Sequence, residues 1–140
     1  MTITVDYGTL RSDPFKASLS KLVNTTELEP KTAYRVMRLA KDIETKLRES
    51  QVEWVKLLGN YVKTEGTQWK LNEEKTDFDY IDGVDKDAAK KEIMGFLAKT
   101  AEISRDKIGL EALSAAKLSP VDLSTLEPII STDDVYWPEV

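Results

Sequence analysis

Apolar residues between Lys31 and Val62 recur at alternating intervals of three and four, which predicts one long amphipathic helix. At 1.5 Å per residue this helix would be about 45–50 Å long, which exceeds the core of a small domain. Another element must therefore cover part of its apolar stripe. One position of the stripe grades from small to large side chains: Ala33, Ala40, Leu47, Trp54 and Tyr61. The next two positions hold Val36, Ile43, Ser50 and Leu57, and then Met37, Glu44, Gln51 and Leu58.

The residues before the long helix predict a strand and a short helix. Thr2–Tyr7 alternates β-branched and polar residues, as a short strand does, and Gly8 ends it. Ser12-Asp13-Pro14 is typical of a helix start, with a capping side chain followed by proline at the first helical position. We expect the buried face of this helix to contain Phe15, Leu19, Leu22 and Val23.

After the long helix, which we expect to end between Gly59 and Thr64, the pattern predicts a loop region and a third helix. Gln68–Leu71 and Phe78–Ile81 could form a hairpin, although the charged residues between them suit a loose loop equally well. The third helix is predicted from about residue 86 to residue 100. We expect it to pack on the second half of the long helix and the two helices to supply the packing centre: Leu47, Trp54, Leu57, Leu58, Ile93, Phe96 and Leu97.

The last part of the domain alternates short elements. Ala101–Ile108 is predicted to be a strand beside Thr2–Tyr7, and Leu110–Ala116 a helical turn. Ser119 and Asp122 have the spacing of a capping box and predict one more helix. Its apolar side would be Leu123, Leu126, Ile129 and Ile130.

Together these elements predict a mainly α fold with a small β component (α+β), in which two or three shorter helices pack on one long helix. We expect a single domain over residues 1–130 and an acidic, aromatic C-terminal tail over residues 131–140. Three alternatives are open for Tyr136 and Trp137 in this tail: they pack on their own subunit, they contact another protein, or the tail is disordered.

The long helix also raises the question of self-association. The shorter helices cover only part of its length, so the seam around Ala33, Val36, Met37 and Ala40, or the seam near Tyr61 and Val62, could stay open and bind a second copy. The alternative is that Leu118–Ile130 folds over this seam and that the protein is a monomer. We favour the homo-oligomer, because the two alanines would let a second helix approach closely.

Composition excludes several kinds of chemistry. The chain has 140 residues, a formal net charge of −5, and neither cysteine nor histidine. Thiol nucleophiles and thiolate metal sites are therefore ruled out, and so are imidazole bases and ligands. No apolar run reaches the roughly 20 residues needed to cross a bilayer, and Met1–Tyr7 lacks the basic residues of a signal peptide. We expect a cytosolic, non-catalytic protein without cofactor or metal.

Acidic residues form two patterns that can bind metal or move protons. Asp77, Asp79 and Asp82 precede Gly83, but the third acid and the glycine come one residue too late for an EF-hand loop, and its twelfth position is Ala88. We interpret this segment as a solvated acidic loop. The adjacent carboxylates Glu73/Glu74 and Asp133/Asp134 lack any sign of an apolar pocket, so we interpret them as exposed charge.

The first half of the long helix is basic. Lys31, Arg35 and Arg38 lie on one face, and Lys41, Lys46 and Arg48 follow, against only two acids. Such a face could contact nucleic acid or an acidic partner. Because the chain has a net negative charge, we prefer a solvated face that the acidic 73–92 segment balances, and expect no nucleic-acid partner.

The order of elements and the segment Leu118-Ser119-Pro120-Val121-Asp122-Leu123-Ser124-Thr125-Leu126-Glu127-Pro128-Ile129-Ile130 resemble a family of small, functionally uncharacterised proteins of tailed bacteriophages and prophages. The likeness covers residues 14–130. It implies a phage structural or assembly protein that acts through contacts with itself and with phage or host proteins, in the host cytoplasm or in the virion. The alternative is a small inhibitor of a host protein.

Overall fold

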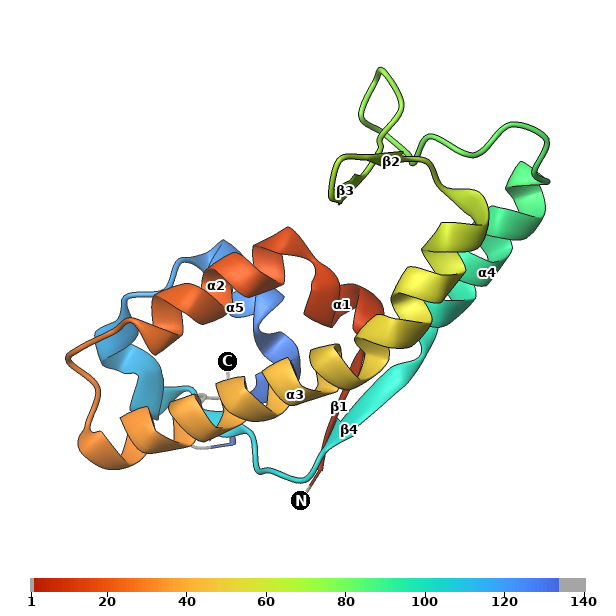
Figure 1. The fold of residues 1–140 in the computed structure, drawn as a ribbon. Coiled ribbons are helices and arrows are strands. Elements are labelled where there is room, and N and C mark those ends of the chain that lie inside the picture. The colour runs from red at the N-terminus through yellow and green to blue at the C-terminus, as the bar shows by residue number, and fades with distance from the viewer. Residues whose placement is uncertain (1, 134–140) are drawn as a thin grey trace, which may run out of the picture.

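One helix, α3 (Pro30–Tyr61), runs along the whole molecule, and the other elements pack along it (Figure 1). The structure is a computed structural model that describes residues 2–133. It is 58% helical and 15% strand, so the predicted class of mainly α with a small β component is confirmed.

Local sequence signals set the limits of α3. Pro30 occupies the start of the helix, where its missing N–H costs nothing, and the chain becomes extended at Val62 (φ −115°). The predicted end between Gly59 and Thr64 is therefore confirmed. The predicted stripe needs one correction, because Leu39 is buried and Met37, Glu44 and Gln51 are exposed. The buried face of α3 consists of Thr32, Val36, Leu39, Ile43, Ser50 and Leu58.

The N-terminal elements are β1 (Ile3–Asp6), α1 (Tyr7–Arg11) and α2 (Asp13–Val23). The Ser12 hydroxyl caps α2 by accepting a hydrogen bond from the backbone N–H of Phe15, as the sequence predicts. The prediction was wrong for Val23, whose side chain is exposed because it follows the buried Leu22 by one residue, which turns it about 100° round the helix.

The first strand pairs antiparallel with β4 (Thr100–Ile103), placing Ile3 opposite Ile103. This confirms the predicted pairing of the two segments. The predicted second strand is too long, however, because residues 104–107 leave the strand and Ile108 begins a different one, β5 (Ile108–Gly109).

The segment after α3 forms a small irregular sheet. β2 (Thr64–Glu65) pairs with β3 (Gln68–Trp69), and single bridges join Val62 to Tyr80 and Leu71 to Phe78. The expected hairpin is thus reduced to one bridge, and the partner of β3 is a strand that the sequence analysis missed. Next comes α4 (Lys86–Ala98), which the Asp85 carboxylate caps and which packs on α3.

The C-terminal part returns to the first half of α3. It contains the 3-10 helix η1 (Glu111–Ala116), α5 (Pro120–Thr125), η2 (Glu127–Ile129) and β6 (Ile130–Ser131), which pairs parallel with β5. The predicted capping box at the start of α5 is present, with both of its hydrogen bonds.

Buried apolar side chains form two clusters along α3. The first lies under α2, β1, β4 and the C-terminal elements and includes Phe15, Val36, Ile43 and Leu126. The second joins the end of α3 to α4 and the small sheet: Leu58, Val62, Tyr80, Ala89 and Ile93.

The predicted packing centre is divided between these clusters. Leu58, Ile93 and Phe96 are buried, as expected. Trp54, Leu57 and Leu97 are half-buried at the edge of the second cluster, whereas Leu47 packs on the first. The division follows from the length of α3, since no single layer of shorter helices extends along all of it.

Arg11 lies where the two clusters approach each other. Its guanidinium donates hydrogen bonds to Ser50 Oγ (2.8 Å) and Gln51 Oε1 (3.2 Å) on α3. Its Cζ is 5.1 Å from the ring centroid of Trp54 and 5.8 Å from that of Phe96. Burial lowers the pKa of this group from its ordinary value. The cation thereby joins α1 to both α3 and α4.

The expectation of an open seam on the first half of α3 is wrong. Val36 is only 2% exposed, and Ala33 and Ala40 are half-buried. Contacts from α2, β4 and β5 cover this face, and Ile129 belongs to the same cluster, as in the alternative we had considered. Met37 is exposed because it lies outside the buried arc. The two aromatic tail residues, Tyr136 and Trp137, lie outside the described residues.

Candidate anion-binding groove

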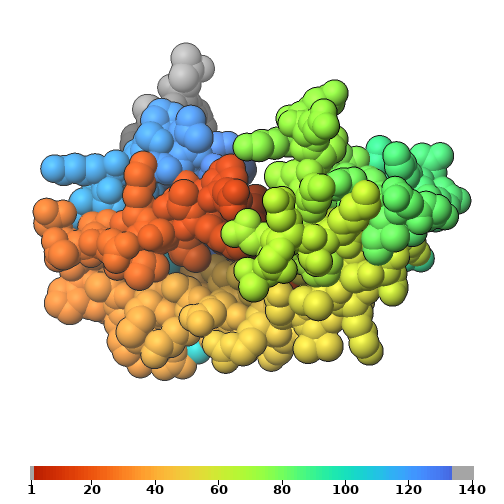
Figure 2. Space-filling model, turned by 45° about the horizontal axis from the view of Figure 1, so that its top comes forward, coloured from red at the N-terminus to blue at the C-terminus, as the bar shows by residue number. Residues whose placement is uncertain are grey.

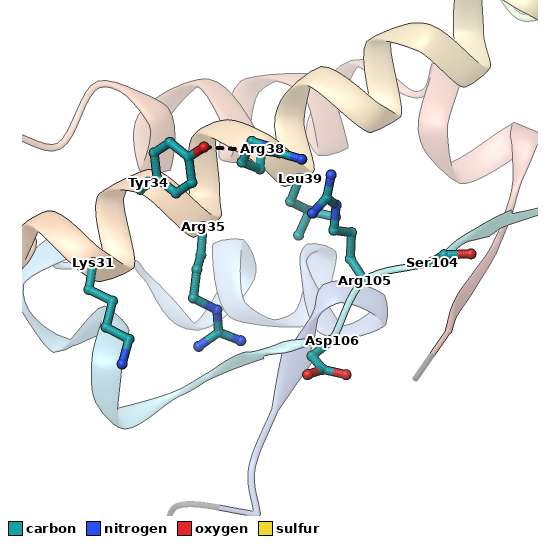
Figure 3. Close-up of a pocket in the computed structure, with 8 residues that line it drawn as sticks. All are labelled: Lys31, Tyr34, Arg35, Arg38, Leu39, Ser104, Arg105 and Asp106. Atoms are coloured by element: carbon teal, nitrogen blue, oxygen red, sulfur yellow. Dashed lines mark hydrogen bonds between the residues drawn. The ribbon is translucent and has the colours of Figure 1, made fainter.

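A groove of about 560 Å³ lies between the first half of α3 and the segment that follows β4 (Figure 3). Its buried floor is Leu39. The first turns of α3 supply one wall and residues 104–106 supply the other. The remaining lining residues are Lys31, Tyr34, Arg35, Arg38, Ser104, Arg105 and Asp106.

An ion pair holds the two walls together. Arg105 Nε donates to Asp42 Oδ2 at 2.6 Å, and both side chains are about one-third exposed (36% and 34%). On the same side, Arg35 Nη2 donates to the backbone carbonyl of Lys107 at 3.2 Å. The segment after β4 is therefore fastened to α3 at two points, which sets the width of the groove.

Tyr34 positions the guanidinium of Arg38. Arg38 Nη1 donates to the Tyr34 hydroxyl at 3.0 Å, and Arg38 Cζ is 5.7 Å from the ring centroid. The two residues are one helical turn apart, so this contact depends only on local geometry. It orders the Arg38 side chain beside the groove before any ligand binds.

The groove gathers positive charge. Four cations and one carboxylate line it, and Arg105 is the cation that pairs with Asp42. Within residues 2–133, none of the ion pairs involves Lys31, Arg35 or Arg38. Arginine side chains in such a row can donate hydrogen bonds from their planar guanidinium groups. This arrangement suits a ligand with carboxylate or phosphate oxygens.

The acidic 73–92 segment does not balance these cations, contrary to our expectation. Figure 1 places it at the opposite end of α3. Its carboxylates contact lysines there: Asp79 lies near Lys63 and Lys70, and Asp77 near Lys90. In the folded protein, the acidic segment therefore does not neutralise the positive charge on the first half of α3.

The same contacts bear on the calcium-like spacing of residues 77–83. Asp77 Oδ1 accepts a hydrogen bond from the Tyr80 hydroxyl at 3.0 Å, and Asp82 lies 3.6 Å from the ammonium of Lys63. Burial and this hydrogen bond raise the pKa of Tyr80 to about 12. The carboxylates thus hold the small sheet together. Residues 2–133 contain no cluster of three or more acidic side chains that could bind a metal ion.

The sequence identified part of the groove. Helical spacing placed Lys31, Arg35 and Arg38 on one face, and the structure brings them together. It missed Arg105, because Arg105 and its partner Asp42 are 63 residues apart. The carboxylate pairs are not brought into this site: Glu73 and Glu74 are exposed at the other end of the molecule, and Asp134 lies outside the described residues.

Comparison of the chain with protein-family models, with curated proteins and with solved structures finds no match. In the part of the chain that the structure describes, no helix is both long enough and apolar enough to span a membrane.

Proposed function

We propose that this protein is a non-catalytic binding protein that holds an acidic segment of another protein in the basic groove. The observation that carries the proposal is the set of three cations, Lys31, Arg35 and Arg38, that no ion pair neutralises within residues 2–133 although the chain as a whole is acidic. Because these cations lie beside residues 104–106, which are fastened to α3, they would bind the carboxylates of a ligand at a defined position in the groove.

An acidic peptide fits this groove better than a nucleic acid does. Lys31 and Arg38 are seven residues apart on α3, or about 10 Å, which accommodates two or three carboxylates of an extended chain. Duplex DNA binders commonly contact six to ten phosphates. The groove offers four cations, and the net charge of −5 repels a long polyanion.

The resemblance to small phage proteins supports a role for this binding in the phage life cycle. We propose that the protein acts in phage assembly, as a virion component or an assembly factor, and that its partner is another phage protein with an acidic segment. Mass spectrometry of purified virions tests the setting. Many copies per particle support a structural role, and complete absence contradicts a virion component.

A binding experiment tests the groove itself. We expect a fluorescent ten-residue peptide of alternating Glu and Gly to bind the full chain, as followed by fluorescence anisotropy at low salt. The Arg35→Glu/Arg38→Glu variant should bind at least about tenfold more weakly, and added salt should weaken binding to the wild type.

The matched control is Lys86→Glu/Lys91→Glu, which changes the net charge equally at two exposed positions on α4. This variant should bind the peptide within about twofold of the wild type. An equal loss in both double variants would show that only net charge matters and would contradict a site. Tighter binding of a DNA duplex than of the peptide would replace the acidic protein partner with nucleic acid.

A further inference from the structure

The outer side of α3 carries a second stripe that no described element covers. Of the nine large hydrophobic side chains that are exposed within residues 2–133, four lie on it: Tyr34 (56%), Met37 (37%), Val52 (69%) and Val55 (43%). Between them are exposed charged residues, Lys41, Glu44 and Arg48. In Figure 2, α3 (orange to yellow) forms one edge of the molecule from end to end.

These residues share one face by helix geometry. At 100° per residue, positions 34, 37, 41, 44, 48, 52 and 55 fall within an arc of about 80°. The centre of this arc lies about 140° round the helix from the buried face. Gly59 continues the stripe, and a Cβ atom placed there would meet no other atom within 4 Å, so the stripe is open at this end too. The intervals of three and four are those of a helix that pairs with another helix.

The order of residues along the stripe is complementary to itself. When two copies of α3 run antiparallel about a two-fold axis at residue 46, Met37 lies opposite the partner's Val55. Glu44 then lies opposite the partner's Arg48, and Lys41 opposite the partner's Gln51. A two-fold axis repeats each contact, so the pairing contains two apolar layers and two Glu–Arg pairs.

We propose that this stripe binds a second copy of the chain in that antiparallel register. Within one chain Glu44 and Arg48 already form an ion pair at 3.2 Å, with both side chains 71% exposed. Dimerisation would replace this pair within each chain by the same pair between the two chains. The paired layers run from residue 37 to residue 55, which is about 27 Å along the helix. This surface shares Tyr34 with the edge of the basic groove, and it lies on the opposite side of α3 from the buried seam around Val36.

A charge exchange tests the register. Glu44→Arg alone and Arg48→Glu alone each leave like charges opposite each other, so each should weaken self-association at least about tenfold. An equimolar mixture of the two variants restores both opposite-charge pairs and should associate within about threefold of the wild type. The measurement is sedimentation equilibrium of the full chain over a range of concentrations, with circular dichroism as a check on folding.

Cysteine cross-linking tests the orientation, because the natural chain contains no cysteine. The Met37→Cys and Val55→Cys chains, mixed and oxidised, should form a disulfide-linked heterodimer. Preferential cross-linking of Met37→Cys chains with one another would indicate a parallel pair and contradict the proposal.

Val121→Glu, which changes an exposed valine on α5, is the control and should leave association unchanged, whereas Val55→Glu should abolish it. A wild-type mass of 15.8 kDa at all concentrations would also overturn the proposal.

Discussion

At the scale of single residues, Asp122 joins the C-terminal segment to the rest of the fold. Its carboxylate is buried and accepts hydrogen bonds from Ser18 Oγ and Lys21 Nζ on α2, both at 2.8 Å. It also accepts from the backbone N–H and the hydroxyl of Ser119, at 3.1 Å and 3.0 Å. One side chain therefore caps α5 and fastens it to α2.

These contacts predict a dependence of stability on pH. The hydrogen bond from Lys21, followed by those from Ser18 and Ser119, lowers the pKa of Asp122 well below its ordinary value. Its stabilising contribution is complete above the unfolded pKa of about 3.9 and is lost as the pH falls toward the folded pKa. Urea titrations should show Asp122→Asn less stable than the wild type at pH 7, with a smaller gap at pH 3. A gap that stays constant or widens in acid would contradict the assignment.

At the scale of elements, glycine decides how closely α1 approaches α4. A Cβ atom at Gly8 would lie 3.2 Å from the backbone oxygen of Leu97 and 3.2 Å from Asp6 Oδ1, the atom that caps α1. At Gly95, in the interior of α4, a Cβ atom would meet nothing within 4 Å. The same residue type therefore serves a close contact at one position and only weakens a helix at the other.

This contrast predicts opposite effects of the same substitution. Gly95→Ala should raise the free energy of unfolding by about 0.5–1 kcal/mol, because alanine is the better helix former. Gly8→Ala should lower it by about 1 kcal/mol, since the backbone of α4 cannot move away without disturbing its own packing. Denaturant unfolding of both variants at neutral pH measures the two signs. Stabilisation by Gly8→Ala would show that α1 and α4 are not in close contact there.

At the scale of the whole molecule, α3 connects two hydrophobic clusters. Figure 2 shows residues 62–98 beside the second half of α3 and α2 beside the first. Only the second cluster depends on the small sheet and α4. Because one continuous helix contributes to both clusters and Arg11 joins α1 to α3 and α4, we expect the two clusters to unfold together, as the predicted single domain over residues 1–130 implies.

A pair of leucine substitutions tests this coupling. Leu58, in the second cluster, and Leu126, in the first, are both fully buried (0% exposed). Leu58→Ala and Leu126→Ala should each cost about 2–5 kcal/mol in the free energy of unfolding. Each variant should still melt in one calorimetric transition. Two separate transitions in Leu58→Ala would mean that the clusters are independent units.

The sequence by itself determined the features that depend on neighbours within a few residues. Proline at residue 30 begins α3, Ser12 caps α2, and Ser119 with Asp122 forms the capping box of α5. Strand alternation was enough to predict that β1 and the residues of β4 are extended. These signals are readable because hydrogen bonds at helix ends and side-chain periodicity are local properties of the chain.

Only the tertiary structure decided which faces are covered and which charges meet. It buried Val36, left Met37 exposed, and paired Arg105 with Asp42 to form the second wall of the basic groove. It also placed the acidic 73–92 segment at the far end of α3, where its carboxylates cannot neutralise the cations near residue 35. Such contacts join residues far apart in the chain, and helix periodicity gives the face of a residue but not the element that packs against it.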